Sequence, residues 1–291
     1  MKKIIEKASV LIEALPYIQR FRNEVVVVKF GGSIMEDPVG IKSILKDIAF
    51  MQCVGLKPVI VHGGGKAITQ KMNEKGVRPV FIKGLRVTDE ASIRVVEHVL
   101  NHEVNPKIVE RLNAYGCQAL GLHGDDILKA DKKSVEATEP DNPIDLGYVG
   151  EATNVDTTPV EAFLKSGITP VITPLGKGPD RMIYNVNADE AAAAIAKTLK
   201  ARKLVFLSDV PGLLENPHNS DTLISTVYVD EIETYIKRGV INGGMLPKML
   251  GGKKALEMGV RKTHIIDSSL PHSLLLELFT DKGVGTEIVT E

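Results

Sequence analysis

Two glycine-rich segments follow directly on apolar runs of the chain, and they are the first candidates for chemistry. They read Lys29-Phe30-Gly31-Gly32-Ser33 and His62-Gly63-Gly64-Gly65-Lys66. Glycine lets backbone N–H groups approach an anion closely, and a helix that begins after the glycines adds a favourable dipole. Neither segment matches the GxxxxGK[ST] phosphate loop or the GxGxxG dinucleotide pattern. Each alone is compatible with a tight turn, but two on successive strands favour an anion site.

Three cationic side chains stand close to glycines or to predicted element ends. Lys29 ends an otherwise apolar strand, so it either reaches to the surface or faces a ligand phosphate. Lys248 follows Gly243 and Gly244 and is either an exposed helix lysine or a second phosphate contact. Arg86 precedes a predicted helix, where it forms a surface salt bridge or grips a carboxylate with two parallel hydrogen bonds.

A polar cluster precedes the helical run that begins near residue 188. Asn187 is a candidate N-cap, and Asp189 is a favourable acid in the first turn. Those local roles explain each residue singly. Together with Asn185, the three polar groups also suit a binding site.

Several other chemistries are excluded by what the sequence lacks. The seven histidines form no HExxH pattern or metal-ligand spacing, so a protein-held metal is not expected. There is no GxSxG nucleophile segment and no Cys/His pair. A site rich in backbone donors and cations, without a base, suits phosphoryl transfer. A carboxylate acceptor needs no base, because it is already ionised at pH 7.

The composition is that of an ordinary globular protein of 291 residues, enough for one large α/β domain or two lobes. The net charge of −1 shows no excess of positive charge of the kind that binds nucleic acid or an anionic membrane. We interpret Cys53 and Cys117 as reduced core residues. No apolar run is long enough to span a membrane, and Glu6 and Glu13 interrupt any signal-peptide pattern. The expected location is the cytoplasm.

The elements that must position these residues alternate between strands and helices, which predicts an α/β fold with a mostly parallel sheet. The polar stretch 124–157, with Pro140 and Pro143, is expected to form short hairpin strands. Asn105 is the expected N-cap of a helix that ends before Gly116. Strands are predicted at 25–30, 58–62, 117–123, 168–173, 203–208 and 263–267, and helices at 41–54, 89–103, 106–115, 159–166, 188–200, 230–238, 246–258 and 271–279.

An amphipathic helix is predicted at residues 3–22, ahead of the first strand. Pro16 lies inside it and is expected to kink it. The apolar face of this helix packs either on its own domain or on another subunit, and the residues alone leave both possibilities open. The apolar face recurs at Ile4, Ala8, Leu11, Leu15 and Ile18.

The ordered segments resemble the amino acid kinase family, and most closely its acetylglutamate kinase branch. The motifs that carry the resemblance are VKFGGS, VIVHGGG, KGLRVTDE (83–90), DLGYVG (145–150), NVNADEAA, LSDVPGL and GGMLPK. VKFGGS is shared among related kinases, whereas the others in this order are much more specific. The matching stretches run from residue 25 to residue 289.

The resemblance implies an αβα sandwich of two lobes plus an N-terminal kinked helix. It implies an oligomerisation helix at 1–24, an amino-acid-binding lobe at 25–178 and an ATP-binding lobe at 179–291, with a seam near Gly176–Pro179. The implied reaction is ATP-dependent phosphorylation of N-acetyl-L-glutamate, with Mg²⁺ carried on the phosphates. The implied catalytic residues are Lys29, Lys248 and Asp189; the acceptor-binding residues are Gly64, Gly65, Arg86, Asn185 and Asn187; the ATP-binding residues are Gly31, Gly32, Ser208, Asp209, Val210, Gly212 and Lys248.

A second resemblance, to arginine-inhibited hexameric members of the branch, lies at the chain ends. It implies a homo-hexamer, a trimer of dimers interlaced by the helix at 3–22, and feedback inhibition by arginine. Two departures are local: Asp267-Ser268-Ser269 replaces an expected glycine-containing turn, and Lys66 stands where proline is commoner. The implied arginine-binding residues are Tyr17, His264, Glu277 and Gly283.

Other functions stay open at this point. A related kinase could act on N-acetylaminoadipate, since one methylene is hard to exclude from sequence, whereas GLRVT with NVNAD argues against aspartate. A non-catalytic arginine sensor has no need of both Lys29 and Lys248. A nucleotide-dependent dehydrogenase is disfavoured by the missing GxGxxG pattern.

Overall fold

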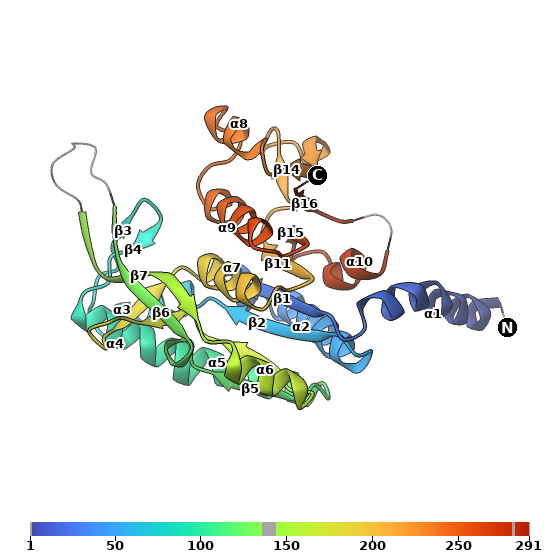
Figure 1. The fold of residues 1–291 in the computed structure, drawn as a ribbon, viewed down its shortest axis with the longest axis horizontal. Helices are drawn as coiled ribbons and strands as arrows, with labels where there is room; N and C mark the ends of the chain where they lie inside the picture. Colours follow the sequence, from blue (N-terminus) through green and yellow to red (C-terminus); the bar gives the residue numbers. More distant parts are fainter. Residues whose placement is uncertain (1, 136–143, 281–282, 291) are drawn as a thin grey trace.

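The computed structural model describes residues 2–135, 144–280 and 283–290. Its main sheet has eight strands in the order β14-β16-β15-β11-β1-β2-β8-β5, all parallel to their neighbours except the β15–β16 pair. Helices cover both faces (Figure 1), which confirms the predicted α/β sandwich with a mostly parallel sheet. The strands of this sheet are β1 (Val25–Phe30), β2 (Lys57–His62), β5 (Ala119–Leu122), β8 (Thr169–Ile172), β11 (Lys203–Ser208), β14 (Thr226–Tyr228), β15 (Lys262–Asp267) and β16 (Thr286–Val289).

A smaller closed four-stranded unit and two short hairpins complete the strands. In the closed unit, β6 and β7 form the antiparallel hairpin expected within 124–157; Pro140 and Pro143 lie outside the described residues. The Gly176–Pro179 stretch, predicted as a seam, leads through the β9–β10 hairpin of this unit. The strands are β6 (Leu128–Val135), β7 (Ile144–Val155), β9 (Leu175–Lys177), β10 (Ile183–Val186), and the pairs β3 (Phe81–Ile82) with β4 (Leu85–Arg86) and β12 (Leu213–Leu214) with β13 (Leu223–Ile224).

The predicted helices begin and end close to their expected limits, with one notable exception, and the helix α3 was not predicted. The run predicted as one helix at 89–103 is an α-helix followed by a π-helical segment, η2 (Val99–Val104), which leads without a break into α5. The α-helices are α1 (Lys2–Phe21), α2 (Pro38–Cys53), α3 (Gly65–Glu74), α4 (Glu90–His98), α5 (Asn105–Ala114), α6 (Thr158–Lys165), α7 (Ala188–Thr198), α8 (Ile232–Lys237), α9 (Met245–Glu257) and α10 (Ser273–Phe279), and the short 3₁₀ segments are η1 (Gly32–Met35), η3 (Gly124–Asp126) and η4 (Ser220–Thr222).

Two predictions are wrong at this level. Asn105 does not cap α5, because the helical backbone is continuous through η2 and its amides already have partners; the Asn105 side chain turns inward instead. Cys117 is buried as expected, but Cys53 is exposed at the end of α2. Both cysteines are free.

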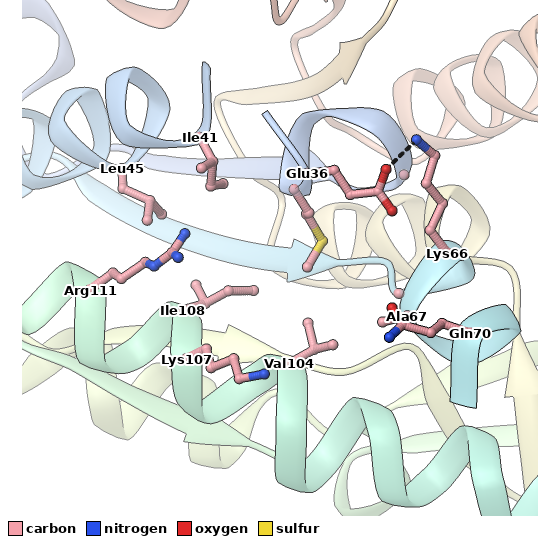
Figure 2. A pocket seen from close by; sticks show the side chains of 13 residues that line it. Glu36, Ile41, Leu45, Lys66, Ala67, Gln70, Val104, Lys107, Ile108 and Arg111 are labelled. Carbon is pink, nitrogen blue, oxygen red and sulfur yellow. Dashed lines mark hydrogen bonds and ion pairs between the residues drawn. The ribbon is translucent and has the colours of Figure 1, made fainter. Parts of the chain in front are cut away.

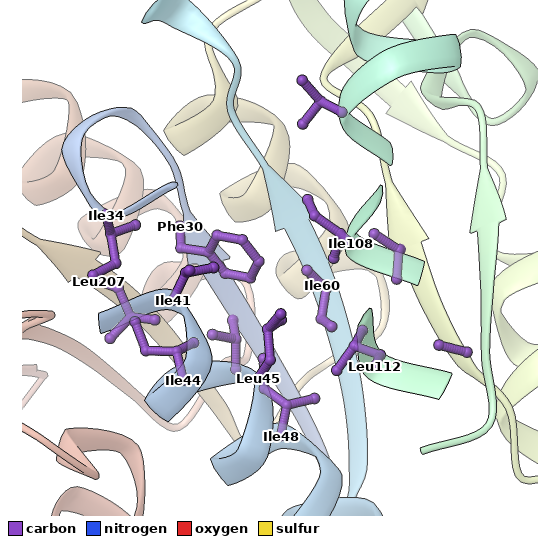
Figure 3. Close-up of a cluster of buried hydrophobic side chains, with 14 of the residues drawn as sticks. Phe30, Ile34, Ile41, Ile44, Leu45, Ile48, Ile60, Ile108, Leu112 and Leu207 are labelled. Carbon is purple, nitrogen blue, oxygen red and sulfur yellow. The ribbon is translucent and has the colours of Figure 1, made fainter. Parts of the chain in front are cut away.

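The alternation of side chains along β1 divides the core into two halves. Val26, Val28 and Phe30 pack on the face covered by α2 and α5, as Figure 3 shows for Phe30. Val27 lies in the opposite half, among the alanines of α7. Because side chains alternate with a period of two, Lys29 shares the face of Val27. The sequence pattern of the strand therefore directs Lys29 towards α7.

The helix α1 extends away from the body of the molecule (Figure 1). It runs uninterrupted through Pro16, and only its last turn enters the core, through buried Phe21. Its preceding turns expose an apolar set: Ile5, Val10, Leu11, Ile12 and Leu15. No helix in the described part of the chain has the length and hydropathy that a membrane crossing requires.

Candidate active site

The candidate site lies where three parallel strands end at the same edge of the sheet. The register pairs Lys29 of β1 with Val61 of β2 and with Phe206 of β11, so the segments that follow these strands emerge side by side. Ligands bind in such sheets at the carboxyl ends of the strands. The two glycine segments and Ser208 therefore meet at one place, as predicted.

The centre of the site is a carboxylate held between two ammonium groups. Asp189, on the first turn of α7, has a side chain only 6% exposed, and its Oδ1 lies 2.7 Å from Lys29 Nζ. Its Oδ2 accepts a hydrogen bond of 2.8 Å from Lys248 Nζ. Burial alone would raise the pKa of Asp189, but the charges of Lys29 and Lys248 hold that pKa below its ordinary value. The three predicted catalytic residues thus form one ion-pair cluster, whose net charge is positive.

Small residues allow Lys248 to reach this carboxylate from another helix. An added Cβ at Gly251 of α9 would lie 3.3 Å from the Ala193 side chain and 3.7 Å from the Asp189 carbonyl. The alanine-rich α7 and α9 therefore pack closely at Gly251. This approach places Lys248, one turn earlier on α9, beside Asp189.

The two glycine segments touch through their main chains. A Cβ on Gly31 would come within 3.0 Å of the Gly63 Cα, and Gly63 N donates a 2.8 Å hydrogen bond to the Phe30 carbonyl. Gly32 has φ of +60°, in the left-handed region that favours glycine. The loops can lie this close because neither carries a side chain at the contact.

Arg86 lies in the neighbouring cleft, which has a volume of about 630 Å³. The charged residues that line this cleft are Arg86, Lys66, Glu36 and Glu74, and Gly32, Gly65, Thr69 and Phe81 also line it. Its Nη2 donates to the Gly65 carbonyl at 2.9 Å and to Thr69 Oγ1 at 2.7 Å, and its guanidinium lies 4.6 Å from the Phe81 ring centroid. Burial lowers the pKa of Arg86, which nevertheless stays charged. The Arg86 guanidinium is thus the group of this cleft that suits a carboxylate ligand.

Thr69 and Phe81 were not predicted as functional residues. Thr69 stands four residues after Gly65, so one helical turn brings it beneath the glycine segment. That spacing is a signal the sequence does contain. The position of Phe81 depends on the β3–β4 hairpin, which pairs Phe81 with Arg86.

Other predicted acceptor-binding residues occupy different positions around the cleft. Asn185 Nδ2 lies 3.4 Å from Thr88 Oγ1, two residues beyond Arg86. Asn187 Oδ1 accepts from the amides of Asp189 and Glu190, so it is the N-cap of α7. The N-cap role predicted for Asn187 is therefore confirmed, and its Oδ1 faces the amides of α7. Gly64 and Gly65 lie at the start of α3, with Gly64 at the N-cap position.

The predicted nucleotide residues of β11 and the loop after it lie beside the lysine cluster. Ser208 is buried at the end of β11, whereas Asp209 is exposed. Val210 is half-buried. Gly212 has φ of +152°, and a Cβ there would lie 2.5 Å from Thr286 Oγ1. This loop packs too closely on β16 to hold a side chain at Gly212.

A second cavity, of about 210 Å³, lies behind the glycine segments between α2, α3 and α5. Figure 2 shows Lys66 reaching across to Glu36 at one end, with a distance of 2.5 Å between Nζ and Oε2. Apolar side chains such as Leu45 and Ile108 line the other end. Lys66, the local departure noted in the sequence, is thus held at the rim by an ion pair.

Within 2–135, 144–280 and 283–290, no three His, Cys, Asp or Glu side chains lie together as a set that could hold a metal ion. The donors at the site are ammonium groups and backbone amides, which suit phosphate oxygens.

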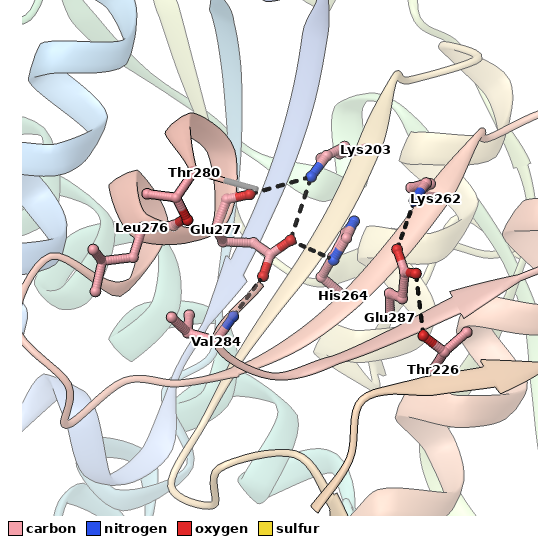
Figure 4. Close-up of polar contacts among 9 residues, drawn as sticks. All are labelled: Lys203, Thr226, Lys262, His264, Leu276, Glu277, Thr280, Val284 and Glu287. Carbon is pink, nitrogen blue, oxygen red and sulfur yellow. Dashed lines mark hydrogen bonds and ion pairs between the residues drawn. The ribbon is translucent and has the colours of Figure 1, made fainter. Parts of the chain in front are cut away.

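Three of the four predicted arginine-binding residues, His264, Glu277 and Gly283, lie together, and Figure 4 shows His264 and Glu277. Glu277 Oε1 lies 2.7 Å from His264 Nδ1 and 3.4 Å from Lys203 Nζ, while its Oε2 accepts from Val284 N at 3.2 Å. Burial would raise the pKa of Glu277, but the contacts with His264 and Lys203 lower it to about 2. A Cβ on Gly283 would lie 3.0 Å from Glu277 Oε2. Asp281 and Lys282, in the same predicted segment, lie outside the described residues.

Tyr17, the fourth predicted residue, is half-buried on α1 and packs at the edge of the core that also contains α10. Phe21, one turn later, lies beneath Lys203, whose Nζ is 5.5 Å from the ring centroid. The α1 helix and the Glu277 cluster are therefore physically connected through Lys203.

Comparison with known proteins places these features in a context. The sequence profile of the amino acid kinase family matches residues 24–267. An acetylglutamate kinase from Syntrophomonas wolfei is 45% identical over 287 residues, covering 99% of this chain and 98% of that protein.

Solved structures give the same fold. The N-acetylglutamate synthase from Neisseria gonorrhoeae, complexed with coenzyme A and L-arginine, superposes with a TM-score of 0.80 at 26% identity; the match covers 98% of this chain and 65% of that longer protein. The carbamate kinase from Giardia lamblia, bound to AMP-PNP, gives a TM-score of 0.65 at 19% identity over 92% of this chain and 99% of that one, which shows the fold alone.

Proposed function

This chain belongs to the amino acid kinase family, and from that premise we propose that its site performs phosphoryl transfer from ATP to N-acetyl-L-glutamate through Lys29, Lys248 and the glycine segments. The product is N-acetyl-L-glutamyl 5-phosphate, an acyl phosphate of arginine biosynthesis. The observation that carries the assignment of roles is the Lys29–Asp189–Lys248 cluster at the carboxyl edge of the sheet.

The reaction needs positioning and charge stabilisation more than proton transfer. A side-chain carboxylate oxygen of the acceptor forms a bond to the γ-phosphorus, while the bond from phosphorus to the β–γ bridging oxygen breaks and ADP leaves with that electron pair. The acceptor is ionised at neutral pH, so no base is required. Lys29 and Lys248 stabilise the phosphoryl oxygens and the leaving group, where negative charge is concentrated.

Asp189 holds both lysines rather than reacting. Its carboxylate keeps the two ammonium groups in place before the nucleotide arrives, at 2.7 and 2.8 Å. Two like charges so close would otherwise repel each other in a buried site. The acceptor lies in the adjacent cleft with its α-carboxylate against Arg86, and Asn185 and the Gly64–Gly65 segment lie around the rest of the acceptor. The nucleotide lies along Gly31, Gly32 and the Ser208–Gly212 loop.

An ADP-release assay with a panel of acids tests the assignment. N-acetyl-L-glutamate is the expected substrate, with N-acetylaminoadipate, L-glutamate and L-aspartate as competitors. K248A should lose about 10²–10³-fold in kcat, while K253A on the same helix, which pairs with Glu233, serves as the matched control. Preference for another acid would contradict the substrate, and normal kcat in K248A would contradict the mechanism.

We also propose that the protein is a hexamer inhibited by arginine and that it acts in the cytoplasm. The support is the exposed apolar set on α1 and the buried Glu277 cluster to which α1 is joined. Glu277 Oε2 accepts only the Val284 amide among the described residues, so it retains capacity for a guanidinium. Residues 1–24, 25–178 and 179–291 would then serve assembly, acceptor binding and nucleotide binding, respectively.

A truncation tests the regulatory proposal. Because Phe21 is buried in the core, the deletion must stop before it, so residues 1–15 are removed. The expected product is an active, smaller assembly that no longer responds to arginine, measured by light scattering and inhibition curves. A truncated protein that stays hexameric and fully inhibited would contradict the role of α1, and an E277Q variant with normal inhibition would contradict the arginine site.

A further inference from the structure

His62, the first residue of the HGGG segment, has a fully buried side chain with two hydrogen bonds. Its Nδ1 lies 2.9 Å from the Gly63 carbonyl oxygen, and its Nε2 lies 3.1 Å from Asn105 Nδ2. Asn105 Nδ2 also donates to the Val171 carbonyl at 2.8 Å. No chemistry described above uses His62, although it stands at the carboxyl end of β2 beside the site.

These contacts determine where the proton of the imidazole lies. A carbonyl only accepts hydrogen bonds, so the contact with Val171 fixes the amide nitrogen of Asn105 as the atom facing His62. An amide nitrogen only donates, so His62 Nε2 is the acceptor. The Gly63 carbonyl in turn needs a donor, so Nδ1 carries the proton. Burial lowers the pKa of His62 to about 4, in agreement with a neutral ring.

Asn105 is itself held in place by packing. Ile108 and Leu112 pack α5 against β2, as Figure 3 shows with Ile60, and Asn105 lies one turn before Ile108 on the same side of the helix. A Cβ at Gly121 of β5 would lie 2.2 Å from Asn105 Oδ1, so only glycine leaves room there. The π-helical segment before Asn105 adds a residue to the turn, a device frequent near functional sites.

The contact with Gly63 has a consequence for the next residue. The peptide unit that joins Gly63 to Gly64 is planar and trans, so its C=O and N–H point in opposite directions. The His62 ring holds the carbonyl on the buried side, which turns the Gly64 N–H outward to the open end of β2. Gly63 N is fixed as well, by the Phe30 carbonyl. Within the described residues no hydrogen bond from the Gly64 N–H is present.

We propose that His62 is a positioning residue that aims the Gly64 N–H at the oxygens of the transferring phosphoryl group, with Asn105 as its support. The inference rests on the proposed kinase function. The buried chain runs from the Val171 carbonyl through Asn105 and His62 to the Gly63–Gly64 peptide. It fixes a main-chain donor before the ligand arrives, which is the arrangement that stabilises developing charge most effectively.

Two nearly isosteric variants separate positioning from a merely structural role. In H62N the amide nitrogen takes the position of Nδ1 and can still donate to the Gly63 carbonyl. In H62Q the amide oxygen takes the position of Nε2 and can still accept from Asn105, but the donor to the Gly63 carbonyl is lost. Both lose packing and should melt at lower temperature than the wild type. H62N should retain kcat within about threefold, and H62Q should lose about 10–100-fold in kcat with KM for ATP nearly unchanged, since a displacement of about 1 Å costs up to 10²-fold. H98Q, at an exposed histidine of α4, is the matched control.

If kcat of the two variants falls equally, or follows their melting temperatures, the positioning role is wrong. If H62N loses activity while H62Q keeps it, the donor has been assigned to the wrong nitrogen and the proposal is also overturned.

A measurement on the resting enzyme keeps the proposal testable whatever the activity. In ¹⁵N-histidine-labelled full-length protein, the imidazole signal that disappears in H62N should show the Nδ1–H tautomer, without titration between pH 5.5 and 8. An Nε2–H tautomer, or a titrating ring, would overturn the proposal. Absence of ADP release by the wild type would instead contradict the proposed kinase function and leave the tautomer result to stand alone.

Discussion

Replacing Asp189 by Asn should reveal how the two lysines are held. The substitution keeps the shape of the side chain and removes the negative charge between Lys29 and Lys248, whose side chains are 12% and 13% exposed. Removing one partner from a buried ion pair costs about 3–5 kcal/mol, because an uncompensated charge remains. At about 2–4 °C per kcal/mol for a domain approaching this size, the melting temperature should fall by roughly 6–20 °C.

The same variant should respond more strongly to nucleotide than the wild type does. In D189N the phosphates of MgATP restore the missing negative charge, so the increase in melting temperature on adding the nucleotide should be larger. The kcat should nevertheless fall by about 10²-fold or more, since the ammonium groups are no longer positioned before binding. Thermal melts with and without MgATP, and ADP release, measure these effects.

A neighbouring residue provides the control. Glu190 stands on the same turn of α7 and pairs with Lys133 at 2.6 Å, with side chains 27% and 23% exposed. A partly exposed pair of this kind contributes about 0.2–1 kcal/mol, so E190Q should melt within about 4 °C of the wild type.

The pH dependence gives a further check on Asp189. Because its pKa in the folded state is below the ordinary value, its contribution is present above the unfolded pKa and is lost as the pH falls through the folded one. The difference between the wild type and D189N should therefore persist from pH 5 to pH 8. A D189N protein as stable as E190Q, or one whose response to MgATP is weaker than that of the wild type, would refute this account of the cluster.

Three further predictions follow from other contacts. R86K should raise KM for the acceptor roughly 10–100-fold with a smaller change in kcat, because lysine cannot reproduce the two-pronged contact of a guanidinium; an effect on KM for ATP alone would place Arg86 in the wrong pocket. G64A should lose activity because its Cβ would lie 2.6 Å from Leu100 Cδ2, and adding L100V should restore part of kcat, whereas no gain in the double variant would exclude this clash as the cause. Burial raises the pKa of Asp47 to about 6, so the folded state binds its proton more tightly than the unfolded chain, and the free energy of unfolding should fall as the pH rises from about 4 to 6. In D47N the free energy of unfolding measured with denaturant should change less with pH over that window, and an unchanged pH dependence would refute the assignment.

The sequence predicted the site best where local pattern and position along a strand suffice. The valine run of β1 places Lys29 at the carboxyl edge of a buried sheet. The alternation of strands and helices predicts parallel strands, and this brings the two glycine segments together at that edge. The partnership of Lys29 with Lys248 could not come from pattern alone. It depends on how closely α9 packs on α7, a tertiary contact between residues far apart in the chain.

Asn105 shows why local rules fail at such a site. Followed by Pro106, it has the local signature of a helix start, and the N-cap prediction followed from that. The π-helical segment supplies partners to the backbone instead, so the side chain is free to turn inward. The roles of Glu277 and His264 came from resemblance, because their pairing crosses from β15 to α10.

The main-chain contact between Gly31 and Gly63 limits how the acceptor preference of this site can evolve. At 3.0 Å from the projected Cβ of Gly31 to the Gly63 Cα, this junction leaves no room for a new side chain. Substitutions that change the preferred acid must therefore arise around the junction, at wall positions such as Thr69, Phe81 and Asn185. On the proposed assignment, a change of acceptor is therefore expected to come from the replaceable side chains of the cleft, while the junction of Gly31 with Gly63 stays constant.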